Sequence, residues 1–277
     1  MRYLKFLRRP APELTEIPTE GWLETEFDGL KWKFLLSNYM DRTIAKTKTF
    51  EPATSALVKK IVKPGMRVLD IGANIGYYAL QMAKLTGASG KVYAFEPTNW
   101  YRERLTWHVN ANHFEDRVEI IPFGLSNCRE TLEIEIDNIS ATLHQIRATK
   151  PEDIFKEKIE MDTLDALNAR MKFDPIDFVK VDIDGHEPFM LEGAQDFFRR
   201  NLPIMVIEFS QISLDVAGSD VREVKKKLDD MGYTLFSEKT YLPMDRMGFL
   251  RECGDFSHSA NAWAIPAGKI QNLSELF

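Results

Sequence analysis

An apolar run that ends in an acid and a glycine-bracketed loop constrains the fold of this chain more than any other feature. Residues 67–78 read Arg-Val-Leu-Asp-Ile-Gly-Ala-Asn-Ile-Gly-Tyr-Tyr. An unbroken run of apolar and β-branched residues is typical of a parallel strand that is buried on both faces. Gly72 and Gly76 permit a tight turn in which a ligand approaches bare backbone, and a helix that starts near Ile75 would point its free N–H groups at that ligand. The segment therefore predicts a sheet strand that leads into a nucleotide pocket.

A second strand of the same kind follows along the chain. Residues 91–97 read Lys-Val-Tyr-Ala-Phe-Glu-Pro, so this strand also ends in an acid, Glu96. The carboxyl ends of parallel strands lie at one edge of a doubly wound sheet, where ligands bind. We expect Glu96 to accept hydrogen bonds from both hydroxyls of a ribose. An apolar strand and turn without a ligand is the alternative, and it explains less well why two successive strands end in acids.

The spacing around the glycines discriminates between the common nucleotide ligands. A dinucleotide fold has glycines two apart, where the pyrophosphate touches backbone, and a third glycine where helix and strand pack. Here Asn74 places a side chain where the pyrophosphate would lie, and Tyr77 replaces the third glycine. A phosphate-binding loop fails as well, because Gly90 and Lys91 are followed by valine rather than Ser or Thr. The ligand that fits has a ribose, no phosphate and a cationic or zwitterionic tail near Asp70, which describes S-adenosylmethionine (SAM).

Size and charge narrow the class of protein. The chain has 277 residues, enough for one large α/β domain with an N-terminal extension, which we favour over two small domains. Hydrophobic residues make up 44% and charged residues 28%, as in ordinary soluble globular proteins. The net charge of −6 and the pI near 5.5 give no electrostatic reason to bind nucleic acid, whose phosphates need a basic surface. The oligomeric state is not readable from the sequence.

Cysteine usage and the N-terminal residues bear on the compartment. Cys128 and Cys253 lie far apart with no Cys or His at metal spacing, so neither a disulfide framework nor a zinc site is expected, and a cytoplasmic location is the default. Residues 1–9 are basic and apolar but too short and too interrupted for a secretion signal, and no apolar run is long enough to span a membrane. A weak peripheral membrane contact through residues 1–9 stays open. Four of the five histidines are expected to be surface or packing residues.

The first part of the chain reads as an extension. Residues 10–21 are proline-rich and expected to be irregular. Apolar and polar residues alternate on both sides of an Asp28-Gly29 turn, which predicts a hairpin near 22–36. A helix is expected at 51–62, stopped by a following Pro-Gly pair. We therefore divide the chain into an extension, 1–49, and a main domain, 50–277.

Strands and helices then alternate, which implies a parallel, doubly wound α/β sheet. Between its two halves, period-two alternation predicts an antiparallel flap at about 127–161 rather than a crossover helix. The expected helices are 75–86, 98–112 and 219–231. The seven expected strands are 67–71, 91–95, 117–121, 177–182, 203–209, 232–236 and 261–265.

One predicted strand carries an unusual charge. Side chains at 178, 180 and 182 share a face, so Lys180 and Asp182 point the same way. A lysine inside a buried strand is costly unless it is paired or faces a cleft. Two interpretations stay open, a structural ion pair of Lys180 with Asp182 or Glu208, and a functional cleft.

The segment that follows this strand raises the question of a metal. Residues 182–187 read Asp-Ile-Asp-Gly-His-Glu, but alignment on Gly185 puts Lys180 and Leu191 at the first and twelfth positions of a calcium loop, and neither is a suitable oxygen donor. No metal site is therefore assigned. A divalent ion such as magnesium is not favoured but stays open, held by some of Asp182, Asp184 and Glu208.

The same segment supplies a candidate base. Pro188 suits the first turn of a helix, so the loop before it would lead into a helix N-terminus beside the ligand. His186 in this loop has the right chemistry for a general base near neutral pH. A histidine that only caps the loop is an equally good interpretation.

Taken together, several segments of the chain resemble the FkbM family of SAM-dependent methyltransferases. They cover roughly residues 50 to 210, and their combined order is specific, whereas the glycine loop alone marks only the wider fold. One position departs from the family, which usually has Glu where this chain has Asp184. The matching segments are 50–52, 69–78, 95–97, 124–126, 162–165, 176–187, 191–194 and 203–208.

This resemblance implies a Rossmann-like class I methyltransferase fold and O-methylation, often of a hydroxyl on a sugar, a glycan or a secondary metabolite. The cofactor-binding residues it implies are Glu51 and Asp70 at the ammonium end of SAM, Gly72, Asn74 and Gly76 along its methionine portion, Glu96 at the ribose, and Gly124, Leu125 and Ser126 at the adenine edge. The candidate catalytic residues around the acceptor hydroxyl are Asp182, His186 and Lys180.

Two functions of other classes compete. The first is a SAM-binding or glycan-binding module without catalysis, which would act as a partner in a polysaccharide-making complex. The polar residues at four strand ends argue against it. The second is an NAD-dependent sugar-modifying enzyme, against which Asn74 argues. In either case the expected partner is a small molecule or a glycan.

Overall fold

The computed structural model describes residues 19–136, 141–142, 155–255 and 258–272. The expected surface contact at 1–9 and most of the proline-rich segment fall outside these residues. The described part of the chain is built around a seven-stranded sheet with the order β12-β13-β11-β10-β3-β4-β5, in which β13 runs antiparallel to both neighbours. The seven strands are β3 (Arg67–Ile71), β4 (Lys91–Phe95), β5 (Val118–Ile121), β10 (Phe178–Val181), β11 (Ile204–Phe209), β12 (Tyr233–Ser237) and β13 (Ala260–Pro266).

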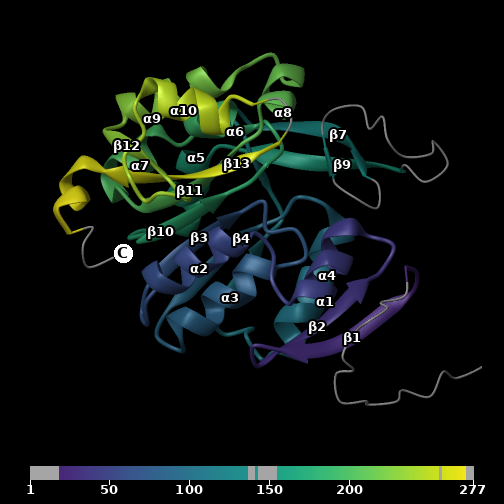
Figure 1. Cartoon of the computed structure of the whole chain (residues 1–277). Coiled ribbons are helices and arrows are strands. Elements are labelled where there is room, and N and C mark those ends of the chain that lie inside the picture. The colour runs from purple at the N-terminus through teal and green to yellow at the C-terminus, as the bar shows by residue number, and fades with distance from the viewer. Residues whose placement is uncertain (1–18, 137–140, 143–154, 256–257, 273–277) are drawn as a thin grey trace, which may run out of the picture.

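This sheet confirms the predicted α/β class, and its strands match the seven expected ranges to within a residue or two. Helices cover both faces, so the architecture has three layers (Figure 1). One face carries α1 (Tyr39–Thr47), α2 (Pro52–Ile61), α3 (Tyr77–Thr86) and α4 (Asn99–Ala111). The other carries α5 (Leu164–Met171), α6 (Glu187–Glu192), α7 (Gln195–Asn201), α8 (Gln211–Val216), α9 (Val221–Asp230) and α10 (Arg246–Cys253), and a 3-10 helix, η2 (Ala267–Asn272), follows the last strand.

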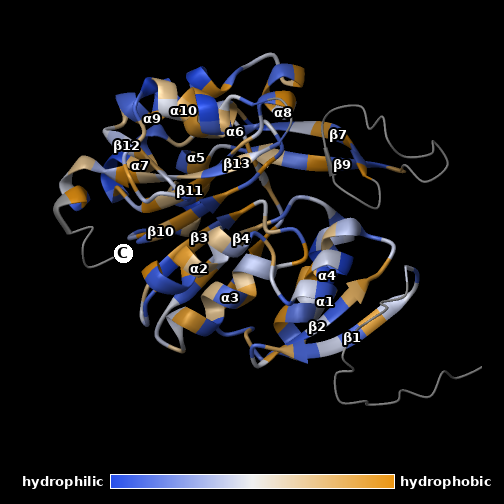
Figure 2. Cartoon of the chain, viewed as in Figure 1, coloured by the Kyte–Doolittle hydropathy of each residue, from blue (hydrophilic) through white to orange (hydrophobic). Residues whose placement is uncertain are grey.

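The two helical layers correspond to two hydrophobic cores, one on each face of the sheet. Figure 2 shows hydrophobic residues along the central strands and hydrophilic residues on the outer helices. The helix α9 illustrates the pattern, since its buried residues Val221, Val224 and Leu228 recur at helical spacing. Its N-cap Asp220 accepts hydrogen bonds from the N–H groups of Arg222 and Glu223, which satisfies donors that the first turn leaves open.

The N-terminal hairpin forms as predicted. Strands β1 (Trp22–Phe27) and β2 (Leu30–Leu35) pair antiparallel, and Asp28 (φ 52°) and Gly29 (φ 66°) form the turn between them. Positive φ at both central residues is typical of a type I′ turn, a common two-residue connection between the twisted strands of a hairpin. Trp32 and Phe34 are fully buried in the same core as Tyr77, and their rings stack. The hairpin is therefore packed against the helices that carry the predicted ligand loop.

His108 ties this hairpin to the loop after β3. Its Nε2 accepts a hydrogen bond from the N–H of Lys33, at 2.9 Å, and its Nδ1 lies 2.8 Å from the carbonyl oxygen of Ile75. Burial lowers the pKa of His108 to about 4, so the ring is neutral at neutral pH and Nδ1 donates to that carbonyl. The histidine is thus a packing residue, as expected, and it bridges two segments.

The flap between the sheet halves is a second, four-stranded sheet. Strands β7 (Glu130–Ile136) and β9 (Phe155–Asp162) pair antiparallel, which confirms the predicted flap. A short strand, β6 (Gly124–Leu125), runs parallel to β9, and β8 (Ala141–Thr142) lies on the other edge. A Cβ at Gly124 would lie 2.3 Å from Sδ of Met161, so a larger residue there would have to displace the methionine side chain.

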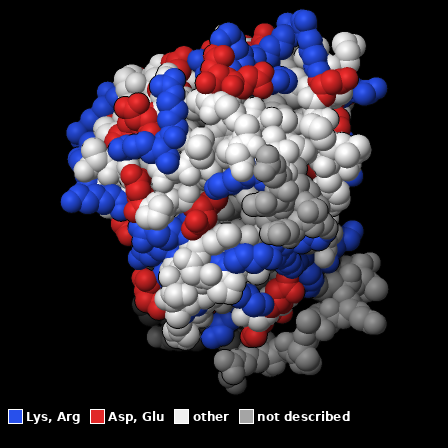
Figure 3. Space-filling model, turned by 90° about the vertical axis from the view of Figure 1, so that its left-hand side faces the viewer, with Lys and Arg blue, Asp and Glu red and all other residues white. Residues whose placement is uncertain are grey.

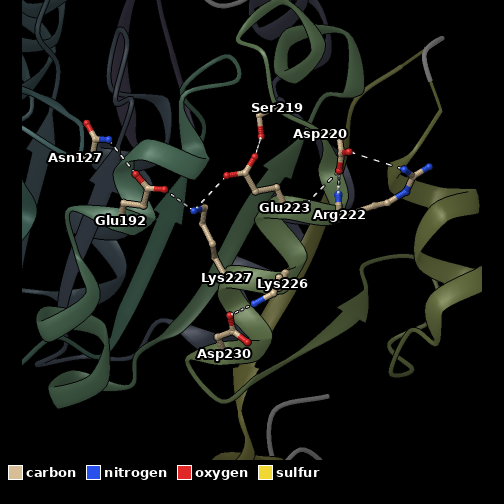
Figure 4. A network of polar contacts seen from close by, with 9 residues as sticks. All are labelled: Asn127, Glu192, Ser219, Asp220, Arg222, Glu223, Lys226, Lys227 and Asp230. Atoms are coloured by element: carbon tan, nitrogen blue, oxygen red, sulfur yellow. Dashed lines mark hydrogen bonds and ion pairs between the residues drawn. The ribbon is translucent and has the colours of Figure 1, made fainter.

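A polar network holds α9, α6 and the loop after β6 together (Figure 4). Glu192 on α6 accepts from Nζ of Lys227 at 2.6 Å and from Nδ2 of Asn127 at 2.9 Å. Lys227 also lies 3.3 Å from Glu223 within α9.

On the face that Figure 3 presents, Lys and Arg are interspersed with Asp and Glu, and neither sign dominates. Within the described part of the chain, no helix is both long and apolar enough to cross a membrane.

Candidate active site

The centre of the sheet has the topology at which ligands bind in doubly wound folds. From β3 the chain continues outward to β4 and β5, whereas β10 continues in the other direction to β11, so β3 and β10 flank the switch point. Gly72 directly after β3 has φ +84°, and a Cβ there would lie 1.9 Å from the carbonyl oxygen of Asp182. Glycine is thus required at this position because two strand ends touch through their backbones.

Two hollows open beside this contact. We call the first the apolar hollow. It is lined mainly by apolar side chains of the strand ends and the flap, and the polar side chains of Glu96 and His186 also line it. The second, the acidic hollow, lies towards α2 and β13 and is lined by Asp70, Lys180, Glu208 and other polar residues. The two hollows adjoin, because both are lined by Gly72, Asn74, Asp182 and Asp184.

Glu96 is buried in the apolar hollow, where three donors hold it. Its Oε2 accepts from the N–H of Asn74 at 2.8 Å, and its Oε1 accepts from the N–H of Thr98 at 3.0 Å and from the hydroxyl of Thr98 at 2.7 Å. Burial raises the pKa of Glu96, and these hydrogen bonds oppose that rise. A carboxylate has about four acceptor sites, so the group keeps capacity for another donor.

Asn74 adopts the left-handed conformation, with φ 53°, and its own Oδ1 accepts from the N–H of Ile75 at 2.7 Å. The expected helix begins two residues later than predicted, at Tyr77, because its N-cap Gly76 has φ 92°. Gly76 lines neither hollow. A Cβ at Gly76 would lie 2.4 Å from Cδ1 of Leu105, so its role in the structure is the close packing of α3 on α4.

His186 lies in the apolar hollow, on the same side as the segment 124–126. Its Nε2 is 3.0 Å from Oγ of the buried Ser126, and its ring stacks on Phe189 at 4.8 Å. Gly124 and Leu125 line this hollow as well. The three candidate catalytic residues are therefore not all brought together, since His186 lines only the apolar hollow and Lys180 only the acidic one. Asp182, which lines both, is the residue they have in common.

Lys180 forms the ion pair that the strand pattern left open, and its partner is Asp182. Nζ of Lys180 lies 2.7 Å from Oδ2 of Asp182 and 4.8 Å from the centre of the Tyr78 ring, and the lysine is 2% exposed. Burial alone would raise the pKa of Asp182, but the ammonium group outweighs it and leaves that pKa below the usual value. Glu208, which is hydrogen-bonded to Asp182, has a pKa well above its usual range because of burial and the charge of Asp182.

Asp70 ends strand β3 in the acidic hollow. It is 1% exposed, and its Oδ2 accepts no hydrogen bond from the described residues. Burial raises the pKa of Asp70 to about 7, although the charge of Lys180 acts in the opposite direction. A buried carboxylate oxygen without a donor is an unstable arrangement that a cationic ligand group would relieve.

Glu51 faces the same hollow from the N-cap position of α2. Its Oε2 accepts from the hydroxyl of Tyr78 and its Oε1 from Nδ2 of Asn261, both at 2.8 Å. Tyr78, Asn261, Thr98 and Glu238 line the hollows but were not among the residues proposed from the sequence. A polar residue at 261, inside an otherwise apolar strand, was the one signal that could have identified Asn261.

The described residues include no cluster of three or more His, Cys, Asp or Glu placed to hold a metal ion. Asp182, Asp184 and Glu208 line one hollow, but they do not form such a cluster.

The sequence matches two models of known protein families. A model described as the methyltransferase FkbM domain matches residues 70–235, more than half of the chain. The chain belongs to the FkbM methyltransferase family. Residues 70–235 are thus a methyltransferase domain of this family, whose cofactor is SAM. A second model, described as protein-L-isoaspartate(D-aspartate) O-methyltransferase, matches residues 11–122.

Several solved structures are similar to this FkbM methyltransferase. The methyltransferase FkbM from Methylobacillus flagellatus KT has 15% identity and a TM-score of 0.46, covering 80% of this chain and 52% of its own. The Aeropyrum pernix fibrillarin in complex with natively bound SAM has 15% identity and a TM-score of 0.45, with 91% and 86% covered. A SAM-dependent O-methyltransferase from Thermotoga maritima has 15% identity and a TM-score of 0.45, with 88% and 78% covered. This chain thus spans about half the length of the Methylobacillus protein. No curated protein matches the sequence.

Proposed function

We propose that this protein is an O-methyltransferase that transfers the methyl group of SAM to a hydroxyl of a sugar, a glycan or a secondary metabolite. The observation that carries the proposal is the place of Asp182, an ionised carboxylate at the junction of the two hollows. An alkyl hydroxyl must lose a proton when it is methylated, and a carboxylate at that junction is placed to receive it.

The residues around the junction fit SAM. The apolar hollow would take the adenosine, with Glu96 at the ribose and Leu125, Ser126 and His186 at the adenine edge. Asp70, whose Oδ2 has no donor among the described residues, would face the cationic end, with Glu51 beside it. The loop from Gly72 to Asn74, which lines both hollows, would lie along the methionine portion. In this arrangement the activated methyl group is supplied by SAM as a sulfonium when it is bound.

The protein then has three tasks. The walls of the apolar hollow exclude water from the reacting atoms, and the acidic hollow orients the acceptor hydroxyl towards the junction. Asp182 accepts the proton of that hydroxyl. Lys180 keeps Asp182 ionised, and Glu208, whose raised pKa leaves it protonated, donates a hydrogen bond to Asp182.

The proposal includes a compartment and a class of partner. Both cysteines are free thiols, which suits a reducing compartment such as the cytoplasm. The acceptor would be a small molecule or a glycan rather than a nucleic acid, in line with the net charge of −6.

Two variants test these roles with labelled-methyl transfer to sugar acceptors and with calorimetry. Asp182→Asn keeps the shape of the side chain but removes the proton acceptor, so turnover should fall by roughly 10² or more while SAM affinity changes little. Glu96→Ala should instead weaken SAM binding by about 1.5 to 3 kcal/mol, as expected for hydrogen bonds to a charged group. A protein that binds SAM but transfers no methyl group to any acceptor would be the inactive binding partner instead.

A further inference from the structure

The acidic hollow has a large excess of carboxyl groups over cationic groups. Among the described residues, its lining contains one ammonium group, Lys180, and no other Lys or Arg. Against this single cation it contains six carboxyl groups, which belong to Glu51, Asp70, Asp182, Asp184, Glu208 and Glu238. Burial and the neighbouring carboxylates raise the pKa of Asp184 to about 7 and those of Glu208 and Glu238 above their usual values, so these groups hold protons more readily than ordinary carboxyl groups. A cation that enters the hollow would favour their ionised forms.

SAM accounts for only part of this excess. It carries a sulfonium, an ammonium and a carboxylate, so its net charge is a single positive one. In the proposed arrangement Asp70 and Glu51 face its ammonium end, and Asp182 is already paired with Lys180. The carboxyl groups of Asp184, Glu208 and Glu238 remain without a cation among the residues that line the hollow.

Hydrogen bonding gives a second, independent indication. Asn261 is 6% exposed and lines the hollow, and its Nδ2 donates to Glu51 at 2.8 Å and to Thr54 at 3.0 Å. Its Oδ1, however, is buried and accepts no hydrogen bond from the described residues. This acceptor adds to the unsatisfied Oδ2 of Asp70, so the hollow lacks donors as well as positive charge. Buried acceptors of this kind are normally satisfied.

We propose that the acceptor of this methyltransferase carries a protonated amine, which binds in the acidic hollow among Glu208, Glu238 and Asn261. An ammonium group offers three donors and no acceptor, which is what this lining needs. Tyr39, Phe50 and other aromatic residues also line the hollow, and their ring faces attract cations. The amine takes no part in the reaction and keeps its protons, while the hydroxyl that is methylated lies at Asp182. This inference rests on the proposed function.

The test compares two sugars that differ only at the amine. At about pH 6.5, D-glucosamine is protonated, whereas N-acetyl-D-glucosamine is neutral and has the same hydroxyls. Each is titrated by thermal shift into the protein saturated with S-adenosylhomocysteine, which fills the cofactor site. We expect glucosamine to bind at least about tenfold more tightly than its acetylated form.

Two glutamate variants assign any preference to the hollow. Glu238→Gln keeps the acceptor for the hydroxyl of Thr54, which lies 2.6 Å from Glu238, but removes the charge, so the preference should fall severalfold. Glu252→Gln is the matched control, because Glu252 accepts from Ser237 at 2.8 Å and does not line the hollow. The preference should survive that change.

Three results would overturn the inference. The first is equal affinity for the two sugars, which includes no detectable binding of either. The second is a preference for glucosamine that persists in Glu238→Gln. The third is binding of magnesium chloride alone that Glu238→Gln abolishes. If S-adenosylhomocysteine binds but the amine preference is missing, only this inference fails. If S-adenosylhomocysteine does not bind at all, the proposed function fails with it.

Discussion

Nζ of Lys180 lies 2.7 Å from Oδ2 of Asp182, two residues further along the chain, and this pair sits where the ends of β10 and β3 meet. The lysine is 2% exposed, whereas the side chain of Asp182 is 27% exposed. The pair is therefore sealed on the side of the core and open on the side of the hollows. This one-sided exposure lets the lysine act on the charge of Asp182 while the carboxylate stays accessible to a ligand.

Replacing Lys180 with Met tests this relationship. Loss of an opposite charge within hydrogen-bonding distance should raise the pKa of Asp182 by about one to three units. The acidic limb of the pH profile of methyl transfer should therefore move to higher pH. Steady-state rates across pH measure the shift, and circular dichroism checks the fold. An unmoved profile in a folded variant would show that Asp182 does not accept the proton.

Asp70 should leave a signature in the pH dependence of stability. The pKa of Asp70 is about 7 in the folded protein and 3.8 for an ordinary aspartate, so folding takes up a proton between these values. The contribution of Asp70 to the free energy of unfolding is thus fully present below about pH 4 and is lost as the pH rises through 7. In Asp70→Asn this loss should disappear, making the cofactor-free variant more stable than the natural chain at pH 8, by up to about 4 kcal/mol. Urea unfolding at several pH values measures it.

The same carboxyl group links SAM binding to pH. If the ionised form of Asp70 faces the cationic end of SAM, the affinity should increase as the pH rises from about 6 to 8. In Asp70→Asn the affinity should be weaker and nearly independent of pH over this range. Calorimetry at matched ionic strength distinguishes the two behaviours. A natural chain that binds SAM equally well at pH 6 and 8 would contradict this role of Asp70.

His186 should affect cofactor binding more than chemistry. It lines the apolar hollow and lies 3.0 Å from the hydroxyl of Ser126, so His186→Phe removes that hydrogen bond but keeps a ring against Phe189. SAM affinity should fall by about 0.5 to 1.5 kcal/mol, with turnover at saturating SAM almost unchanged. Ser126→Ala should reproduce the effect. The opposite result, unchanged affinity and a loss of roughly 10² in turnover, would make His186 the general base.

The bridge through His108 predicts a stability loss. His108→Leu leaves the N–H of Lys33 and the carbonyl of Ile75 buried without partners, at a cost of about 1 to 3 kcal/mol each. His113→Asn is the control, since this histidine is exposed and its φ of 57° suits asparagine. Urea unfolding measures both variants.

The pH dependence of stability gives a second test of His108. Because the pKa of His108 is about 4, its contribution to stability is lost as the pH falls from 6.5 through 4, opposite in sign to that of Asp70. A His108→Leu variant as stable as the natural chain would refute the bridge.

The strands were predictable because their signal is local. The runs at 67–71 and 91–95 are mostly apolar, each beginning with a basic residue, and both strands have these bounds in the structure. The hairpin turn at Asp28 and Gly29 was predictable for the same reason, since two residues with positive φ determine its type. The helix α1 was missed although its residues are amphipathic, and the contacts of its buried Asp41 with Leu35 and Arg104 could not be read from the sequence.

The site was predictable only in part. Residues that end a strand, such as Asp70 and Glu96, were identified because parallel strands end at one edge of the sheet. The link between Glu51 and Asn261 joins residues 210 positions apart, and nothing local in either segment points to the other. The placement of His186 was equally hidden, because the turn of its loop decides which hollow it faces.

The class of fold, the polar residues at the strand ends and the family of the chain could be read from the sequence, because alternation, apolar runs and glycine spacing are properties of neighbouring residues. Three features became visible only in the folded chain: Lys180 pairs with Asp182 rather than Glu208, His186 and Lys180 line different hollows, and the pKa of Asp70 lies at about 7. Each of these depends on burial and on distances between segments remote in the chain, and both are set only when the layers pack.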